Sequence, residues 1–273
     1  MPEFNLSNRI IKTEKPAFVA GIVNANSDSF WKESRGGYKL AKRLIEEKAD
    51  LLDIGAESSR PGSHYISEKD ELKALIPLIR KIRKYSDIPI SVDTRKKNVI
   101  KACVEEGADI LNDISAMEDD AQMASYCAQA KIPVILMHKR QNPVIMQKYT
   151  EYNDIFSEVQ DYLYSRINYA LDAGIDSSKI ILDPGIGFAK DLNGNLILIK
   201  RAGELCQKKY PIMMALSRKS CLGQITGRPV SERLSATLAA DLYSVMNGAT
   251  FVRVHDVKET VDTLSVLAAI LSV

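Results

Sequence analysis

The chain is poor in the residues that build metal clusters and disulfide frameworks. Its 273 residues include four cysteines, three histidines and one tryptophan. The cysteines lie far apart, and no two of them form a Cys-x-x-Cys pair: Cys103, Cys127, Cys206 and Cys221. The sequence therefore predicts neither a zinc-ligand set nor a disulfide framework. We expect reduced thiols and a cytoplasmic location.

An excess of charge, long apolar runs and low-complexity linkers are also lacking. The 37 basic and 35 acidic residues give a net charge of +2, unlike the basic surface of a dedicated nucleic-acid binder. No run of about 18 apolar residues is present, and residues 1–5 show no signal-peptide pattern. We therefore expect neither a nucleic-acid partner nor membrane insertion. With 45% hydrophobic residues, we expect residues 1–273 to form a single domain with one core.

What the chain does contain is a repeated unit. A short apolar run ends in polar residues and is followed by a stretch with helical spacing. The apolar runs are residues 18–23, 51–54, 90–92, 110–111, 134–137, 180–182, 212–216 and 251–254. Eight strands that alternate with helices in a chain of this length predict an α/β fold, a (β/α)8 TIM barrel. The polar groups would then converge at the carboxyl ends of the strands, where such barrels build their active sites.

Three stretches show the apolar spacing of helices most clearly, residues 40–49, 72–82 and 155–171. Ser67 and Asp70 form a capping pattern before the second stretch, and Gly174 is placed to end the third. A doubly wound open sheet is the alternative fold. It is less favoured because eight units fill a barrel and no Gly-x-Gly-x-x-Gly turn follows the first strand.

Two carboxylates and an amide stand at predicted strand ends. A buried Asp93 or Asp183 needs donors, and a ligand with adjacent amino and ring N–H groups would supply paired, charge-assisted hydrogen bonds. Asn112 offers both a donor and an acceptor, as a heterocycle edge requires. Alternatively, each of these side chains holds a neighbouring backbone turn.

Positively charged and imidazole groups stand at other strand ends. Their convergence would make a pocket for an anion such as phosphate or pyrophosphate. A structural ion pair with Asp93 or Asp183 is the alternative for each of them. His138, which follows an apolar run, either contacts ligand or supports a residue that does. The donors of the predicted anion pocket are Arg60, Lys219, Arg253 and His255.

Three polar loops complete the predicted mouth. Residues 183–188 form a turn in which Gly185 and Gly187 permit positive φ and close approach of a ligand to the backbone. Phe188 then offers an aromatic face. Residues 24–30 and 58–63 are further loops of the kind that clamp substrates on a rigid barrel.

Taken together, these motifs resemble the dihydropteroate synthase family over nearly the whole chain. The matching segments are residues 21–24 with 28–30, 53–55 through 60–62, 91–94, 112–114, 137–138 with 143 and 146–147, 183–188, 217–219 and 253–257. The family implies a transferase, the target of sulfonamides. It condenses 6-hydroxymethyl-7,8-dihydropterin pyrophosphate with p-aminobenzoate and releases pyrophosphate and 7,8-dihydropteroate.

The resemblance also implies roles for particular residues. Lys219, Arg253, His255 and Asn24 would carry catalysis. Pterin would be bound by Asp93, Asn112, Ile114, Met137, Asp183, Gly187, Lys219 and Arg253. Pyrophosphate would be bound by Asn24, Arg60, Arg253 and His255, and p-aminobenzoate by Phe30, Ser59, Phe188, Ser217 and Lys219. Mg²⁺ is the implied cofactor, with Asn24 as its protein ligand, and a homodimer is the implied assembly.

The chain departs from the family pattern mainly on the aminobenzoate side. Asn26-Ser27 replaces the usual Thr-Pro of the first loop, and Ala189 replaces the glycine that usually follows Phe188. Three other interpretations of the sequence remain open. The protein could be a methyltetrahydrofolate-dependent methyltransferase with a similar pterin pocket, an aldolase that forms a Schiff base on Lys219, or a pterin-binding paralogue without turnover.

Overall fold

The computed structural model describes residues 1–25, 37–57, 65–142 and 144–273. In these ranges eight parallel strands form one sheet in the order β8-β7-β6-β5-β4-β3-β10-β9. A parallel bridge between Leu182 and Ile212 joins its two edges, so the expected (β/α)8 barrel is confirmed. The strands are β3 (Phe18–Asn24), β4 (Leu51–Gly55), β5 (Ile90–Asp93), β6 (Ile110–Asp113), β7 (Val134–Met137), β8 (Ile180–Asp183), β9 (Met213–Met214) and β10 (Phe251–Val254).

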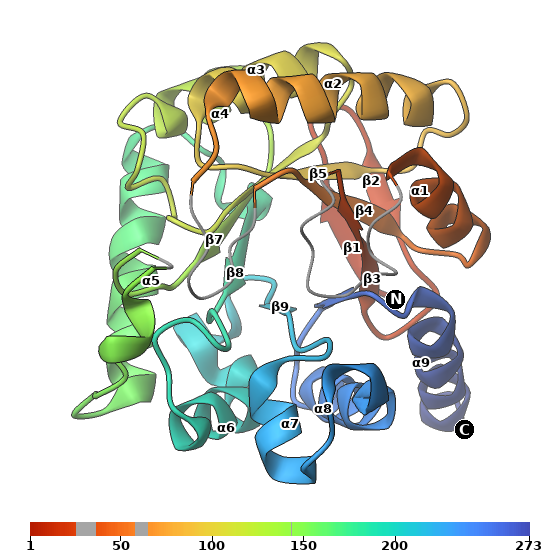
Figure 1. The fold of residues 1–273 in the computed structure, drawn as a ribbon, viewed down its shortest axis with the longest axis vertical. Coiled ribbons are helices and arrows are strands. Elements are labelled where there is room, and N and C mark those ends of the chain that lie inside the picture. Colours follow the sequence, from red (N-terminus) through yellow and green to blue (C-terminus); the bar gives the residue numbers. More distant parts are fainter. Residues whose placement is uncertain (26–36, 58–64, 143) are drawn as a thin grey trace.

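Helices surround the strands (Figure 1). They are α1 (Gly37–Glu46), α2 (Glu68–Arg83), α3 (Lys97–Glu105), α4 (Met123–Ala130), α5 (Ile155–Asp172), α6 (Leu192–Lys200), α7 (Ser220–Thr226), α8 (Leu234–Met246) and α9 (Val257–Leu271). Short 3₁₀ turns span Met146–Lys148, Ser177–Lys179 and Val230–Glu232, and the segment Ala202–Lys208 is 3₁₀-like with a kink of non-helical backbone at residues 205–207. No described helix is both long and apolar enough to cross a membrane.

The helix boundaries follow from local sequence. The Ser67 hydroxyl accepts from the Asp70 amide at 3.1 Å, which satisfies an otherwise unpaired N–H at the start of α2. Asp154 caps α5 in the same way, through the Phe156 and Ser157 amides. Gly174 adopts a φ of +95° just after α5, as expected of a residue that ends a helix.

Five of the eight strands become more polar towards their carboxyl ends. Side chains two residues apart point to the same face of a strand, and in five strands the inward-facing pair changes from an apolar residue to a more polar one. The pairs are Leu51 and Asp53, Ile110 and Asn112, Ile135 and Met137, Ile181 and Asp183, and Phe251 and Arg253. The first members form one buried apolar cluster. The barrel interior is therefore apolar near the strand starts and mostly polar near the strand ends.

An antiparallel hairpin of β1 (Glu3–Asn5) and β2 (Ile10–Lys12) covers the amino ends of the strands. Its Phe4 and Leu6 belong to the apolar cluster inside the barrel. The Phe4 ring meets the Phe251 ring edge-on at 5.5 Å, and Phe251 stacks on Phe18 at 4.8 Å. The hairpin closes the bottom of the barrel, a feature that the sequence did not predict.

Strand β9 is shorter than the predicted residues 212–216. Its pairing with β10 ends at Met214, and the Lys219 amide then closes a turn on the Leu216 carbonyl at 3.1 Å. Because the chain leaves the sheet early, residues 217–219 lie in a loop at the mouth of the barrel.

Candidate active site

A linked set of carboxylates and donors lies at the mouth. Arg253 on β10 donates through Nε to Asp53 on β4 at 2.5 Å and through Nη2 to Asp93 on β5 at 3.2 Å. The Asn112 amide nitrogen donates to both Asp53 oxygens, at 3.1 and 3.3 Å. Asp53 therefore holds Asn112 and Arg253, both of which were predicted to bind pterin. The ion pair between Arg253 and Asp93 had been the alternative explanation for the charge of Arg253, and the structure contains it.

Burial shifts the protonation of these groups. It raises the pKa of Asp93 to about 8, with Arg253 opposing the shift and Asp53 adding to it. Burial likewise raises the pKa of Asp183, against the charge of Lys219. A carboxyl whose pKa is raised by desolvation is stabilised in its charged form when a ligand brings N–H donors. The site can therefore bind a donor-rich heterocycle edge.

Lys219 lies between the predicted pterin and aminobenzoate groups. Its Nζ donates to the Ile186 carbonyl and lies 5.1 Å from the centroid of the Phe188 ring. Burial lowers the pKa of Lys219 to about 8, and Asp183 opposes the shift. The amine therefore changes charge near neutral pH while in contact with the loop that follows β8.

His255 and Ser217 form a second buried pair. The Ser217 Oγ accepts from the His255 amide at 3.1 Å and lies 2.9 Å from His255 Nδ1. Burial lowers the pKa of His255 to about 3, and the nearby charges of Arg253, Arg218 and Lys219 lower it further. Such cationic surroundings favour an anion at this end of the site.

The loop that carries Ser217 and Lys219 is fixed by an ion pair. Arg218 Nε and Nη2 each lie 2.8 Å from an oxygen of Asp256, and Arg218 has a φ of +57°. A bidentate arginine–carboxylate pair is geometrically specific. The pair joins the Ser217–Lys219 loop to Asp256, the residue after His255. Lys219 and His255, both predicted to bind the anion, are therefore kept at a fixed spacing.

An apolar wall lines the mouth beside these polar groups. It is a separate buried cluster of Ile114, Met137, Met146, Phe188 and Ala189. Ile114 and Met137 were predicted for the pterin, and Phe188 for p-aminobenzoate. Gly187 has a φ of +85°, consistent with the predicted turn.

Two other predicted groups are placed by the barrel itself. Asn24 is the last residue of β3 and pairs in register with Gly55. His138 is buried, follows β7 directly and contacts Lys190 through Nδ1 at 2.9 Å, which fits a supporting role. Phe30, Ser59, Arg60 and the unusual Asn26-Ser27 pair lie outside the described residues.

Sequence reasoning assigned no role to three residues of this site, although all three lie in segments that match the family. Asp53 belonged to a matching motif, but its contacts to Asn112 and Arg253 come from distant strands. Met146 and Asp256 act through packing and an ion pair, which no local pattern reveals. Asp53 lies two residues after Leu51 in the same strand, and this spacing could have shown that its side chain faces the barrel interior.

Comparisons with known proteins agree with this geometry. Residues 20–255 match the model of the "Pterin binding enzyme" family. A dihydropteroate synthase of Escherichia coli is 40% identical over 262 residues, which cover 93% of this chain and 92% of that protein.

Two solved structures of Xanthomonas albilineans dihydropteroate synthase are similar over the whole chain. One holds 4-aminobenzoic acid, with a TM-score of 0.91 and 37% identity, covering 100% of this chain and 99% of that one. The other holds 7,8-dihydropteroate, with a TM-score of 0.88 and 35% identity, covering 100% of both chains. The chain belongs to the dihydropteroate synthase family of pterin binding enzymes.

Proposed function

We propose that the protein condenses 6-hydroxymethyl-7,8-dihydropterin pyrophosphate with p-aminobenzoate to give 7,8-dihydropteroate and pyrophosphate. The observation that carries the proposal is the arrangement of the mouth. Partly buried Asp93 and buried Asn112 and Asp183 lie beside cationic Arg253 and Lys219 in one barrel end. A relative with 35% identity holds the same reaction's product.

The pterin is proposed to lie deepest, with its amino and ring N–H groups directed at Asp183 and Asp93. Its binding would supply donors to two carboxyls whose pKa values burial has raised. The Arg253 plane is held by Asp53 and Asp93. A guanidinium fixed in this way can cover an aromatic ring face while its charge faces the leaving group.

The pyrophosphate is proposed to bind at the Asn24, Arg253 and His255 side. The donor chemistry here fits magnesium, because the Asn24 amide would supply one hard oxygen and the pyrophosphate would supply the others. Among the described residues, no cluster of three or more His, Cys, Asp or Glu side chains could hold a metal ion. When bound, Mg²⁺ would neutralise part of the charge on the leaving oxygens.

The proposed mechanism is an SN1-like displacement. The bond between the exocyclic carbon and the pyrophosphate oxygen breaks first, and the pterin ring delocalises the resulting cation. Arg253 and His255 stabilise the negative charge that develops on the leaving group. The neutral aryl amine then attacks the carbon and loses its proton afterwards. The protein therefore acts by electrostatics and by holding two substrates in line.

The decisive experiment measures pyrophosphate release from the pterin substrate with and without p-aminobenzoate. We expect release that depends on p-aminobenzoate and matches dihydropteroate formation mole for mole. Pterin binding without release would identify a non-catalytic paralogue. Methyl transfer from methyltetrahydrofolate, or borohydride trapping of a carbonyl compound on Lys219, would support the other two activities.

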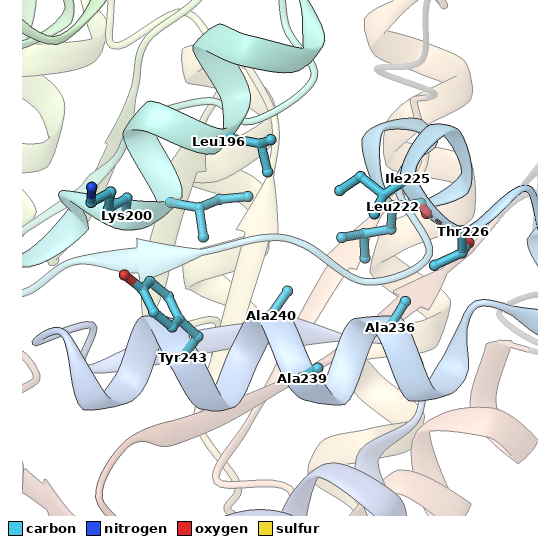
Figure 2. Close-up of a pocket in the computed structure, with 10 residues that line it drawn as sticks. Leu196, Lys200, Leu222, Ile225, Thr226, Ala236, Ala239, Ala240 and Tyr243 are labelled. Carbon is cyan, nitrogen blue, oxygen red and sulfur yellow. Dashed lines mark hydrogen bonds between the residues drawn. The ribbon is translucent and has the colours of Figure 1, made fainter.

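We also propose that the protein is a homodimer and that the second copy covers a hollow between α6, α7 and α8. The hollow has a volume of about 520 Å³. Its lining in Figure 2 is almost entirely apolar, including Leu196, Leu222, Ile225 and Tyr243. Ile225 is 53% exposed, and apolar surface gathered in one hollow is typical of an interface.

Ile225→Glu should shift the sedimentation of the protein from dimer to monomer, and a monomeric wild type would overturn the proposal.

A cytoplasmic location is proposed from the cysteines. All four lie in the described part of the chain, where they are buried and form no disulfide. Free thiols persist in a reducing compartment.

A further inference from the structure

Lys190 is a buried lysine that the proposed reaction does not use. It follows the Gly185–Ala189 loop, and only 4% of its surface is exposed. Its Nζ lies 2.9 Å from three groups, the Gly185 carbonyl, the Phe188 carbonyl and His138 Nδ1. Three partners at hydrogen-bond distance match the three protons of an ammonium group. A lysine buried this completely is therefore satisfied by its surroundings.

The three contacts hold in either protonation state of Lys190. Burial lowers the pKa of Lys190 well below its ordinary value, and it lowers the pKa of His138 to about 2. The imidazole is therefore neutral. An ammonium would donate to all three groups, whereas a neutral amine would donate to the two carbonyls and accept from the imidazole N–H. The contacts are thus maintained over a wide pH range.

The loop that Lys190 binds has an unusual backbone. Gly185, Gly187 and Ala189 have φ values of +70°, +85° and +52°. Left-handed backbone suits glycine but costs about 1 kcal/mol or more for a residue with a side chain. A Cβ on Gly185 would lie 1.9 Å from the His138 carbonyl oxygen. The loop therefore needs contacts from outside itself to keep this conformation.

Side chains supply those contacts at successive carbonyls. Lys190 binds the carbonyls of Gly185 and Phe188. Gln147 donates to the Gly187 carbonyl at 2.7 Å, and the Tyr152 hydroxyl donates to the Ala189 carbonyl at 3.0 Å. The Phe188 amide closes the turn on the Gly185 carbonyl at 3.1 Å. Of these side chains, Lys190 is the one that binds both ends of the turn, so it adds a second link between Gly185 and Phe188 and holds the Phe188 carbonyl in place.

We propose that Lys190 is a positioning residue that fixes Phe188 for p-aminobenzoate. The inference deepens the proposed function and rests on it. Phe188 is the aromatic face assigned to p-aminobenzoate, and its carbonyl is held directly by Nζ. Of the residues assigned to the pterin, Gly187 shares this loop, whereas Asp183 and Asn112 stand on strands β8 and β6, whose positions the barrel ladder sets. Loss of Lys190 should therefore disturb the aminobenzoate side more than the pterin side.

The test compares the KM values for the two substrates in Lys190→Met. Methionine is of similar length and apolar, so it fills the space without the hydrogen bonds. We expect the KM for p-aminobenzoate to rise roughly tenfold, the effect of losing about one buried hydrogen bond. The KM for the pterin substrate should change by less than roughly twofold. Lys101→Met, at an exposed lysine on α3, is the matched control and should leave both values unchanged.

A second variant protects the test against misfolding of the first. Tyr152→Phe removes only the hydroxyl that binds the Ala189 carbonyl, and we expect a smaller rise in the same KM. An unchanged KM for p-aminobenzoate in both variants, or equal rises for the two substrates, would overturn the role of Lys190. If the wild type shows no pyrophosphate release that depends on p-aminobenzoate, the proposed function fails instead, which is a different result.

Discussion

The two ends of the barrel are built from the same strands but differ in chemistry. At the bottom, Phe4, Phe18 and Phe251 pack ring against ring. Two residues further along β10, Arg253 binds two carboxylates. Apolar packing at the bottom depends on area and shape, whereas the mouth depends on charge and hydrogen-bond partners. Stability and function can therefore be separated within one strand.

The largest expected effect is on stability, at the bottom. Phe4→Ala removes a buried ring that the hairpin inserts into the barrel, and should lower the free energy of unfolding by about 3 kcal/mol. Ile10→Ala, at a residue of the same hairpin that is 56% exposed, should have little effect. Urea unfolding measures both. Pterin affinity should stay unchanged in the folded variants, and its loss would show that the two ends are coupled.

The next effect is on binding, at the mouth. Asp183→Asn keeps the shape and the oxygen that accepts from the Gly185 amide at 2.7 Å, but it removes the charge that the pterin N–H groups require. Pterin binding should weaken by roughly 1.5 to 3 kcal/mol in calorimetry. Asp172→Asn, at an exposed residue of α5, is the control. Unchanged affinity in Asp183→Asn would remove this residue from the pterin site.

A third prediction separates binding of the pterin ring from binding of the pyrophosphate within the mouth. His255→Ala should weaken binding of the pterin pyrophosphate substrate roughly tenfold, the loss of about one hydrogen bond to a charged group. It should barely change binding of the pterin alcohol, which lacks the anion. Equilibrium binding of the two ligands is the measurement. Equal losses for both would mean that His255 supports the pocket and does not contact the anion.

The smallest effect concerns a buried carboxyl that belongs to neither end. Within the described residues, neither oxygen of Asp241 on α8 has a hydrogen-bond partner. Burial, with a contribution from Asp256, raises its pKa well above the ordinary value. The folded state then holds this proton more tightly than the unfolded chain does, so this group's contribution to stability falls as pH rises above the unfolded pKa of about 3.9.

Asp241→Asn removes that dependence. At pH 7 the free energy of unfolding of the variant should exceed that of the wild type by about 1 kcal/mol. The difference should shrink towards pH 4, where the carboxyl is protonated in the folded state and about half protonated in the unfolded chain. Thermal unfolding from pH 4 to pH 8 tests this. A gain that is the same at every pH would point to packing and not to the charge of Asp241.

The sequence predicted the barrel because strand ends such as Asp93 and Asp183 directly follow apolar runs. The same rule placed Asn112 and Arg253 at the mouth, where the structure brings them together, although their roles in binding stay predictions. The hairpin was missed because strands of three residues give too short an alternation to recognise. Asp53 and Lys190 were missed because their significance depends on partners that only the folded chain brings near.

The ring contact between Phe4 and Phe251 also bears on how the molecule assembles. The two residues are separated by nearly the whole sequence, and β10 pairs with β3 as well. Contacts of such long range are formed slowly, because the intervening chain must first be ordered. The hairpin has no barrel to cover until β10 is in place. We therefore expect the bottom of the barrel to close in the same late folding event that brings Arg253 to the mouth. Because the pterin site needs Arg253, a chain that has bound pterin has already buried Phe4.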